Sequence, residues 1–238
     1  MSISKETINR LLKDIKQIRN NPLTDNGIYY IHHDSNMLLG YAVLIGPKDT
    51  VYFGGYYLFQ FEFPYDYPHS PPKVFFCTNG QNIRFHPNYY KNGKVCVSLL
   101  NTWRGEQWTS CQTLTSILLT LCSLLNENPL LNEPGVSINH PDVESYNKII
   151  QFYNIDIAIC DILLKKENLY TDEFELFESY IIENFISNKE FILQFIKDKM
   201  ISDDNKLKLR TSLYNMNVEI DYNKLYKKFT KCCNKLKN

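Results

Sequence analysis

Hydrophobic side chains recur near the start of the chain at spacings of three and four residues. The pattern begins after Ser4, which can act as an N-cap, and ends at Asn20-Asn21-Pro22. Its members are Ile8, Leu11, Leu12, Ile15 and Ile18. Because a residue before proline rarely stays helical, the pattern predicts an amphipathic helix over residues 4–19.

After Gly27 the pattern changes to short runs of aromatic and β-branched residues, which are typical of strands. The runs cover residues 28–32, 37–45, 56–63 and 73–76. Glycine, proline and aspartate supply turns between them. The sequence therefore predicts a four-stranded antiparallel meander with the first helix packed on one face.

Residues 78–112 show little regular periodicity, yet they contain many large apolar side chains, including both tryptophans. A loop of this length within a compact domain is usually functional or disordered, and the aromatic content argues against disorder. Helical spacing returns over residues 113–126 and 142–164. The predicted fold class is α+β, in which a first helix, a meander and a long loop are followed by further helices.

Residues 165–238 differ from the preceding chain in the segregation of their charges. Acidic residues concentrate between 167 and 190, and six lysines lie in the last fifteen residues. Apolar residues keep a helical spacing, so we expect a helical carboxy-terminal extension attached to a core of residues 1–164. The acidic and basic faces are expected to pair with each other; the alternative is a partner-docking surface.

Composition places the chain among ordinary globular proteins, with 44% hydrophobic and 22% charged residues. The 26 basic and 26 acidic residues cancel, which argues against nucleic-acid binding by bulk charge. Neither a secretory signal nor an apolar run long enough to span a bilayer occurs. The sequence therefore predicts an intracellular protein that does not bind membranes.

The seven cysteines form no Cys-x-x-Cys pair, and their odd number does not fit a disulfide framework. Most of them are expected to be small core side chains. Cys96 differs because it lies in the long loop. His86-Pro87-Asn88 precedes it by eight residues, counted from Asn88, and Gly93 lies three residues before it.

Three motifs, one upstream of the long loop and two within it, together give the chain a family resemblance. Residues 63–72 read Phe-Pro-Tyr-Asp-Tyr-Pro-His-Ser-Pro-Pro, His-Pro-Asn and Cys96 follow, and Trp108 comes next. In this combination the chain resembles the ubiquitin-conjugating enzymes from the first helix to about residue 160. The loop at 101–108 is longer than the common form. With residues 127–135 it is similar to the branch that contains ubiquitin-conjugating enzyme Z, whose members carry carboxy-terminal extensions.

The resemblance implies a UBC-like fold and an acyltransferase. Cys96 would accept ubiquitin, or a second ubiquitin-like modifier, as a thioester from an activating enzyme and pass it to a lysine of a protein substrate. A ubiquitin ligase is a further expected partner. Because the activating enzyme spends the ATP, the chain is expected to bind no metal or cofactor. The expected location is the cytoplasm or nucleus, of a host cell if the source is viral.

The resemblance also assigns roles to single residues. Asn88 would either donate a hydrogen bond to the thioester oxygen or support the loop; losing such a donor costs about 3–4 kcal/mol in enzymes. The supporting loop would contain His86, Pro87, Ser98, Trp108 and Glu133. We expect His86 to bond the loop backbone, and both Trp103 and Trp108 to act as packing anchors.

Several positions depart from the family pattern. Relatives place an acid beside the cysteine to orient or deprotonate the amine, because a lysine with a pKa of about 10.4 is almost entirely charged near pH 7. Here Leu130, Leu131 or Asn132 falls at that place, and Glu133 is the nearest carboxylate afterwards. At the loops that contact RING or HECT ligases, His69 replaces an aromatic residue and Ser110 a proline. These changes predict an unusual set of ligases or action without one.

Two other interpretations stay open. A non-catalytic ubiquitin-binding scaffold would share the fold, although the presence of Cys96 and Asn88 argues against it. A cysteine hydrolase would pair Cys96 with His86, but no Asp or Asn that would orient this histidine is evident in the sequence.

Overall fold

In this computed structural model, which describes residues 3–167 and 169–236, the chain begins with helix α1 (Lys5–Asn20). Ser4 is its N-cap, and the serine hydroxyl accepts the backbone N–H of Thr7 at 3.0 Å. The predicted first helix is therefore confirmed together with its cap. Leu11 and Ile18 of its apolar stripe are buried in the core.

The predicted meander forms a sheet of four antiparallel strands in the order β1-β2-β3-β4. The strands are β1 (Ile28–His32), β2 (Leu39–Ile45), β3 (Tyr56–Glu62) and β4 (Lys73–Phe76). Val43 pairs with Leu58, and Phe61 pairs with Val74. Because side chains alternate along a strand, one face of the sheet collects buried aromatic rings. They are Tyr57, Phe59, Phe61 and Phe76.

Two helices follow the long loop, as the spacing predicts. Helix α2 (Leu114–Leu124) begins with a capping box between Thr113 and Ser116. Helix α3 (Asp142–Tyr153) continues without a break into a π-helical stretch, Asn154–Asp161. Short 3₁₀ turns make up the other local structure of the core, at Thr24–Asn26, Ser98–Leu100 and Pro129–Asn132.

The extension contains two helices and a hairpin. After a 3₁₀ turn (Asp172–Phe177) come α4 (Glu178–Met200), β5 (Lys206–Arg210), β6 (Asn217–Asp221) and α5 (Tyr222–Lys235), with two more 3₁₀ turns at Asp203–Asn205 and Leu213–Asn215. The helical prediction holds for α4 and α5, whereas the hairpin was not predicted. Its signal is the alternation of charged and apolar residues in Lys206–Arg210, which has the period of a strand.

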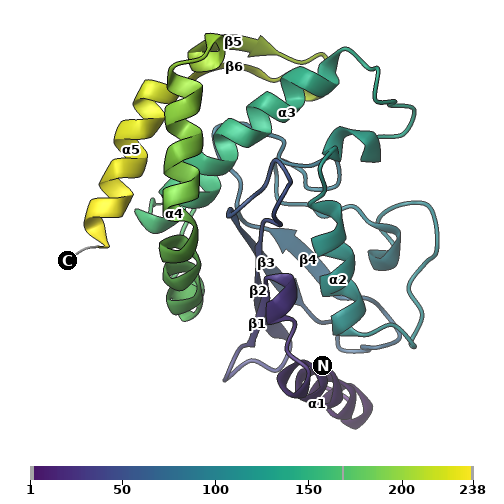
Figure 1. Cartoon of the computed structure of the whole chain (residues 1–238). Helices are drawn as coiled ribbons and strands as arrows, with labels where there is room; N and C mark the ends of the chain where they lie inside the picture. The colour runs from purple at the N-terminus through teal and green to yellow at the C-terminus, as the bar shows by residue number, and fades with distance from the viewer. Residues whose placement is uncertain (1–2, 168, 237–238) are drawn as a thin grey trace.

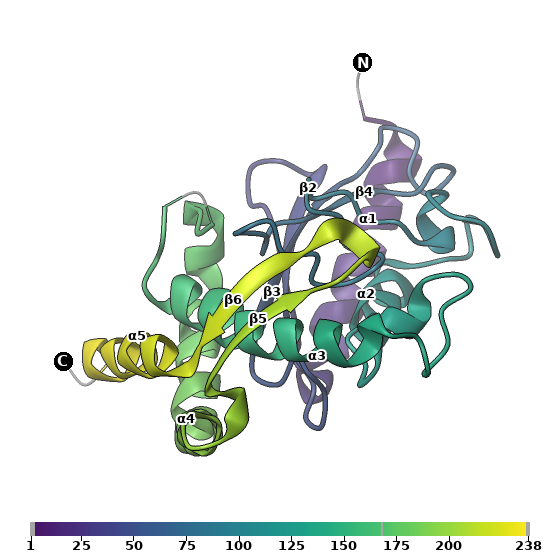
Figure 2. The same cartoon turned by 90° about the horizontal axis from the view of Figure 1, so that it is seen from above.

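Figure 1 shows the sheet between α2 on one side and α4 with α5 on the other. The contact with α4 is direct, because Tyr29 stacks on Tyr180 with ring centroids 4.4 Å apart and Tyr56 donates a hydrogen bond to the carbonyl of Ile181. Viewed from above, the β5–β6 hairpin crosses over α3 (Figure 2). No helix of the described ranges is both long and apolar enough to cross a membrane.

The expected pairing between the acidic segment and the terminal lysines is not found. Within residues 3–167 and 169–236, no ion pair joins the acids of 167–190 to the lysines of α5. Lys228 instead bonds Asp156 and Asp161 of the core, each at 2.7 Å. Helices α4 and α5 pack through apolar contacts, including rings 5.4 Å apart at Phe185 and Phe229. That prediction is wrong because the charged side chains of the two segments either pair with other residues or are exposed to solvent.

Candidate active site

The His-Pro-Asn segment and Cys96 lie side by side because the long loop folds back on itself. The backbone N–H of Cys96 donates to the carbonyl of Asn88 at 2.9 Å, and that of Tyr90 donates to Lys94 at 2.9 Å. Gly93 makes the turn at a φ of 86°. A side chain there would be strained by this backbone conformation and would lie 3.1 Å from the carbonyl oxygen of Phe76.

The side chain of Asn88 points at the cysteine. Its Nδ2 donates to the backbone carbonyl of Cys96 at 2.6 Å. The backbone N–H of Asn88 donates to Nδ1 of His86 at 3.0 Å. The two residues expected to share the chemistry are thus brought together, and in the unloaded chain the amide supports the loop.

The sulfur of Cys96 is covered by the segment that follows it. The residue is only 3% exposed, and its thiol donates to the carbonyl of Thr102 at 2.8 Å. The Thr102 hydroxyl accepts the backbone N–H of Val97 at 2.9 Å, which holds the covering segment in place. Ser98 begins the 3₁₀ turn within this segment and is half-buried. An acyl group on the sulfur therefore requires Thr102 to move aside.

His86 is fully buried and neutral. Burial, and then the nearby Arg84 charge, lower the pKa of its imidazole to about 3. Since Nδ1 accepts a hydrogen bond from Asn88, that nitrogen carries no proton and is already engaged. His86 makes no hydrogen bond to Cys96 within the part of the chain that the structure describes. This geometry argues against a cysteine hydrolase.

Arg84 is a site residue that the sequence reasoning missed. Its guanidinium donates to the carbonyl of His86 at 3.1 Å and to that of Pro87 at 2.5 Å. It also lies over the ring of Tyr90, 3.6 Å from the centroid. Arg84 therefore clamps the backbone of the segment that carries Asn88. The only sequence signal is its position two residues before His86.

The two tryptophans of the long loop behave differently. Trp108 is buried, its indole donates to the carbonyl of Pro68 at 2.7 Å, and its backbone N–H donates to Asn101 Oδ1 at 2.8 Å. These contacts agree with the expected role of Trp108 as a packing anchor. Trp103 is 45% exposed, so the same expectation is wrong for that residue. Its neighbour Thr102 is the residue whose carbonyl meets the thiol.

Glu133 follows the 3₁₀ turn Pro129–Asn132 and is half-buried. Leu130 is fully buried in the core, whereas Leu131 and Asn132 are exposed. The carboxylate of Glu133 accepts a hydrogen bond from the hydroxyl of Tyr214, a residue of the extension. The nearest acid is therefore fixed in place by a part of the chain that the family motifs do not cover.

His69 and Ser110 lie on one surface next to α1. The imidazole of His69 is 3.3 Å from the carboxylate of Glu6, and both side chains are more than half exposed. Arg10 donates to the carbonyl of Ser110 at 2.6 Å. The structure thus brings the two substituted positions together on a polar, exposed surface.

A groove of about 480 Å³ lies beside Cys96. Val95, Leu100 and Thr102 line it from the cysteine side. Lys73 and Lys94 add positive charge, and Phe75 is partly exposed within it. An extended polypeptide tail that approaches the sulfur would meet this apolar and basic surface.

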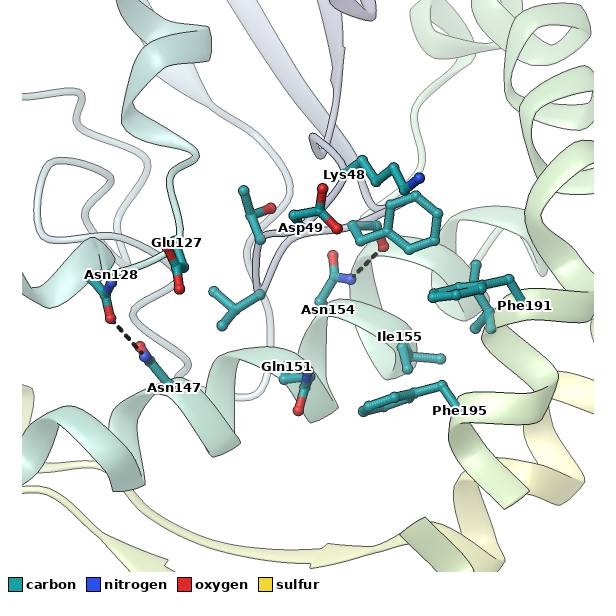
Figure 3. A pocket seen from close by; sticks show the side chains of 14 residues that line it. Lys48, Asp49, Glu127, Asn128, Asn147, Gln151, Asn154, Ile155, Phe191 and Phe195 are labelled. Atoms are coloured by element: carbon teal, nitrogen blue, oxygen red, sulfur yellow. Dashed lines mark hydrogen bonds between the residues drawn. The ribbon is translucent and has the colours of Figure 1, made fainter. Parts of the chain in front are cut away.

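A second cavity, of about 400 Å³, is separate from the predicted site residues. Asn147, Gln151 and Asn154 line it from one helical face, and Phe191 and Phe195 of α4 line it from the other (Figure 3). Asn154 is held there by its hydrogen bond to the carbonyl of Phe53 at 3.0 Å. In the described ranges no group of three or more metal-binding side chains is present.

Comparison with known proteins shows to which family the sequence is similar. The family model described as "Ubiquitin-conjugating enzyme" matches residues 10–154. Ubiquitin-conjugating enzyme E2 Z from Danio rerio is 38% identical over 185 residues, covering 76% of this chain and 56% of the relative. The protein of that name from Homo sapiens is 42% identical over 157 residues, covering 65% and 44%.

A solved structure, that of human ubiquitin-conjugating enzyme E2 G1, is 31% identical and covers 51% of this chain and 94% of that chain, with a TM-score of 0.44. The chain spans about half the length of the E2 Z relatives that it matches, between 44% and 56%.

Proposed function

Because the chain belongs to the family of ubiquitin-conjugating enzymes, we propose that it carries ubiquitin, or a ubiquitin-like modifier, as a thioester on Cys96 and transfers it to a lysine of a protein substrate. The relatives named E2 Z confirm the resemblance to that branch of the family. The observation that carries the proposal is the contact of the Asn88 amide with the Cys96 backbone, 2.6 Å from Nδ2 to the carbonyl oxygen.

Loading exchanges one thioester for another. The Cys96 thiol loses its proton, its sulfur attacks the acyl carbon held on the activating enzyme, and the thiol of that enzyme leaves. In the unloaded chain the thiol donates to Thr102, so this hydrogen bond has to break first. The groove beside Cys96 is the proposed path for the tail of the modifier.

Transfer places negative charge on the thioester oxygen as the amine attacks the carbonyl carbon. The Asn88 amide is one hydrogen bond away from the Cys96 backbone, and a change of its side-chain torsions brings Nδ2 toward this oxygen. A donor of this kind stabilises the transition state by about 3–4 kcal/mol. His86 supports the step indirectly, since it orders the backbone of Asn88.

The incoming lysine must lose a proton before it attacks. Glu133 is the proposed group that orients or deprotonates this amine, because it is the nearest carboxylate after the positions at which relatives carry the acid. Its carboxylate is half-buried and held by Tyr214 rather than free to rotate. A fixed carboxylate can receive the proton only if the amine is brought to it.

The proposed partners are the activating enzyme, ubiquitin or a related modifier, the protein substrate and a ligase. The polar surface around His69 and Ser110 supports an unusual set of ligases or action without one. Ordinary RING domains should therefore fail to stimulate discharge at micromolar concentration, and stimulation would contradict this part of the proposal.

The proposed division of the chain assigns the chemistry to residues 1–164 and a supporting role to residues 165–238. The family model matches residues 10–154 and does not reach the extension, which supports this division. The same pathway gives the cytoplasm or nucleus as the proposed location, in the host cell if the source is viral.

The test is a loading assay with ubiquitin, ATP and an activating enzyme, followed by gels with and without a thiol reductant. The wild-type chain should form an adduct that the reductant removes. Cys96→Ser should give an ester that resists the reductant, whereas Cys111→Ser, at an exposed cysteine, should load like wild type. If no activating enzyme or modifier yields an adduct, yet ubiquitin binds, the chain is a scaffold. Hydrolysis of the modifier's thioester or amide without an activating enzyme would favour the hydrolase.

A further inference from the structure

The tip of the β5–β6 hairpin reaches the loops that carry the proposed site. Tyr214 lies at this tip, and its backbone carbonyl accepts a hydrogen bond from the ammonium of Lys91 at 3.1 Å. The two residues are 123 positions apart in sequence. Lys91 lies between Asn88 and Cys96, so the extension touches the segment that joins the two proposed catalytic residues.

The ring of Tyr214 completes a stack over Arg84. The guanidinium of Arg84 lies 3.6 Å from the ring centroid of Tyr90 and 4.9 Å from that of Tyr214. The same guanidinium holds the carbonyls of His86 and Pro87. An arginine that contacts two rings has less freedom to rotate, which favours one geometry for its hydrogen bonds to the loop.

The hydroxyl of Tyr214 holds a second element of the site. It donates to the carboxylate of Glu133, the proposed acid. Burial, and then this hydrogen bond, raise the pKa of the Tyr214 hydroxyl far above its ordinary value, so it stays a donor. One side chain therefore contacts both the loop that carries Asn88 and the loop that carries Glu133.

The hairpin tip is itself anchored to the core. Tyr214 and Asn215 have φ values of 62° and 48°, a left-handed conformation that non-glycine residues rarely adopt. Asp142, at the start of α3, accepts the Ser212 hydroxyl at 2.7 Å and the Leu213 backbone N–H at 2.8 Å. These bonds hold the tip in the conformation that presents Tyr214 to Arg84 and Glu133.

We infer that Tyr214 is a positioning residue for the Cys96 site: its ring braces Arg84 and thereby the His-Pro-Asn loop, and its hydroxyl fixes Glu133. This inference rests on the proposed thioester transfer. It assigns to the extension a role in positioning the site, although all the family motifs lie within residues 1–164.

The experiment tests the ring contact with Arg84 and the hydroxyl contact with Glu133 separately. It uses different substitutions of Tyr214 and two different amines as acceptors of the modifier. Tyr214→Phe keeps the ring and removes the hydroxyl, whereas Tyr214→Ala removes both. Tyr180→Phe and Tyr180→Ala are matched controls, since Tyr180 also belongs to the extension but stacks on Tyr29 at 4.4 Å on the other side of the sheet. Each variant is loaded, ATP is removed, and single-turnover discharge is followed with either lysine or hydroxylamine, an amine that is already neutral at neutral pH.

We expect Tyr214→Phe to slow discharge to lysine by about tenfold at saturating lysine, because its hydrogen bond to a charged group is lost, and to leave discharge to hydroxylamine unchanged. Tyr214→Ala should slow both reactions, by about tenfold to a hundredfold, because a loop displaced by an ångström misplaces Asn88. The Tyr180 variants should match wild type. Equal rates for the Tyr214 and Tyr180 variants with both acceptors would overturn the inference.

A second measurement does not require the chain to be loaded with a modifier, so it tests the role of Tyr214 even if the proposed function is wrong. The rate at which iodoacetamide alkylates Cys96, measured by peptide mass spectrometry, should rise severalfold in Tyr214→Ala and stay unchanged in Tyr180→Ala. If wild type never loads, the proposed function fails while this measurement still tests the brace. If Tyr214→Ala does not fold, Arg84→Lys tests the brace from its other side, and unchanged alkylation there would contradict it.

Discussion

At Asn88 one amide has two tasks that follow each other in time. In the unloaded chain its Nδ2 donates to the Cys96 carbonyl, which ties the loop together. During transfer the same donor would serve the thioester oxygen. The thioester oxygen belongs to the modifier, but its carbonyl carbon is bonded to the sulfur of Cys96, so a rotation of the Asn88 amide away from the Cys96 carbonyl would connect the two tasks. Removal of this amide can therefore lower the stability of the fold, the stabilisation of the transition state, or both.

We expect Asn88→Ala to load normally and to discharge to lysine about a hundredfold to a thousandfold more slowly, the usual effect of removing one oxyanion donor. Single-turnover discharge of the preloaded variant measures this. Asn92→Ala is the matched control, since Asn92 lies in the same loop and its side chain accepts the Lys94 backbone N–H at 3.1 Å rather than contacting Cys96. A fall in melting temperature with an unchanged discharge rate would instead show that the amide has only the structural task.

His86 predicts a pH dependence of stability. Its pKa is lowered by burial, and then by Arg84, to about 3 in the folded chain, against about 6.5 in an unfolded one. Between these values the unfolded chain binds a proton that the folded chain does not, so the free energy of unfolding falls as the pH drops below about 6.5. In His86→Asn, whose amide oxygen can still accept the Asn88 N–H, this contribution is absent. Urea unfolding at pH 7 and pH 5 should show a smaller loss for the variant; equal losses would contradict the prediction.

At the scale of elements, α5 is attached to the core through two lysines and an apolar face, and Lys235 donates to the carbonyl of Leu163 at 3.0 Å. Lys228 is 24% exposed and bonds Asp161, which is 5% exposed, as well as Asp156. The apolar face includes Leu225, Phe229 and Cys232, all buried. The two carboxylates share this ammonium where little solvent reaches them, and Asp161 is also paired with Lys166 at 3.0 Å.

Lys228→Met should therefore destabilise the chain by about 2 kcal/mol, since it removes charged hydrogen bonds to Asp156 and Asp161 and leaves Asp161 paired with Lys166. Lys227→Met is the control, because the neighbouring Lys227 is exposed and bonds neither carboxylate. Urea unfolding at neutral pH gives both free energies of unfolding. If the two variants are equally stable, the ion pairs at Asp156 and Asp161 contribute nothing net.

At the scale of the whole molecule, the extension covers one face of the sheet and also reaches the proposed site. Phe174 packs edge-on against Tyr41 with centroids 6.0 Å apart, and Tyr180 stacks on Tyr29. Tyr214 touches the loops of the site from another direction. Stability and the geometry of the site are therefore coupled through residues 165–238.

A chain that ends at residue 164 should be less stable than the full chain by several kcal/mol, since burying one large apolar side chain contributes about 1.5–3 kcal/mol. Phe174, Phe177 and Ile181 are all buried in the full chain. Guanidinium unfolding of both forms tests this, and an apolar dye should bind the short form more strongly. An unchanged midpoint would instead support a core that folds independently of its extension.

The sequence by itself determined the elements of the core and the cluster of chemistry. Helical and strand periods are local properties, so α1, the four strands and α2 could be read directly. The spacing from Asn88 to Cys96 could be read as well, because the two residues share one loop. The short alternating strands of the hairpin were missed because they lie among helical patterns and carry many charged residues, unlike the aromatic strands of the core.

Only the tertiary structure decided which distant residues meet. The pairing of α5 with core acids, the exposure of Trp103, and the contacts of Tyr214 with Arg84 and Glu133 depend on packing between segments far apart in the chain. A local pattern predicts which face of a helix or strand is apolar. It does not predict which other element will pack against that face. That choice follows from the packing of the complete chain, which is why the link between the extension and the site had no signal in the sequence.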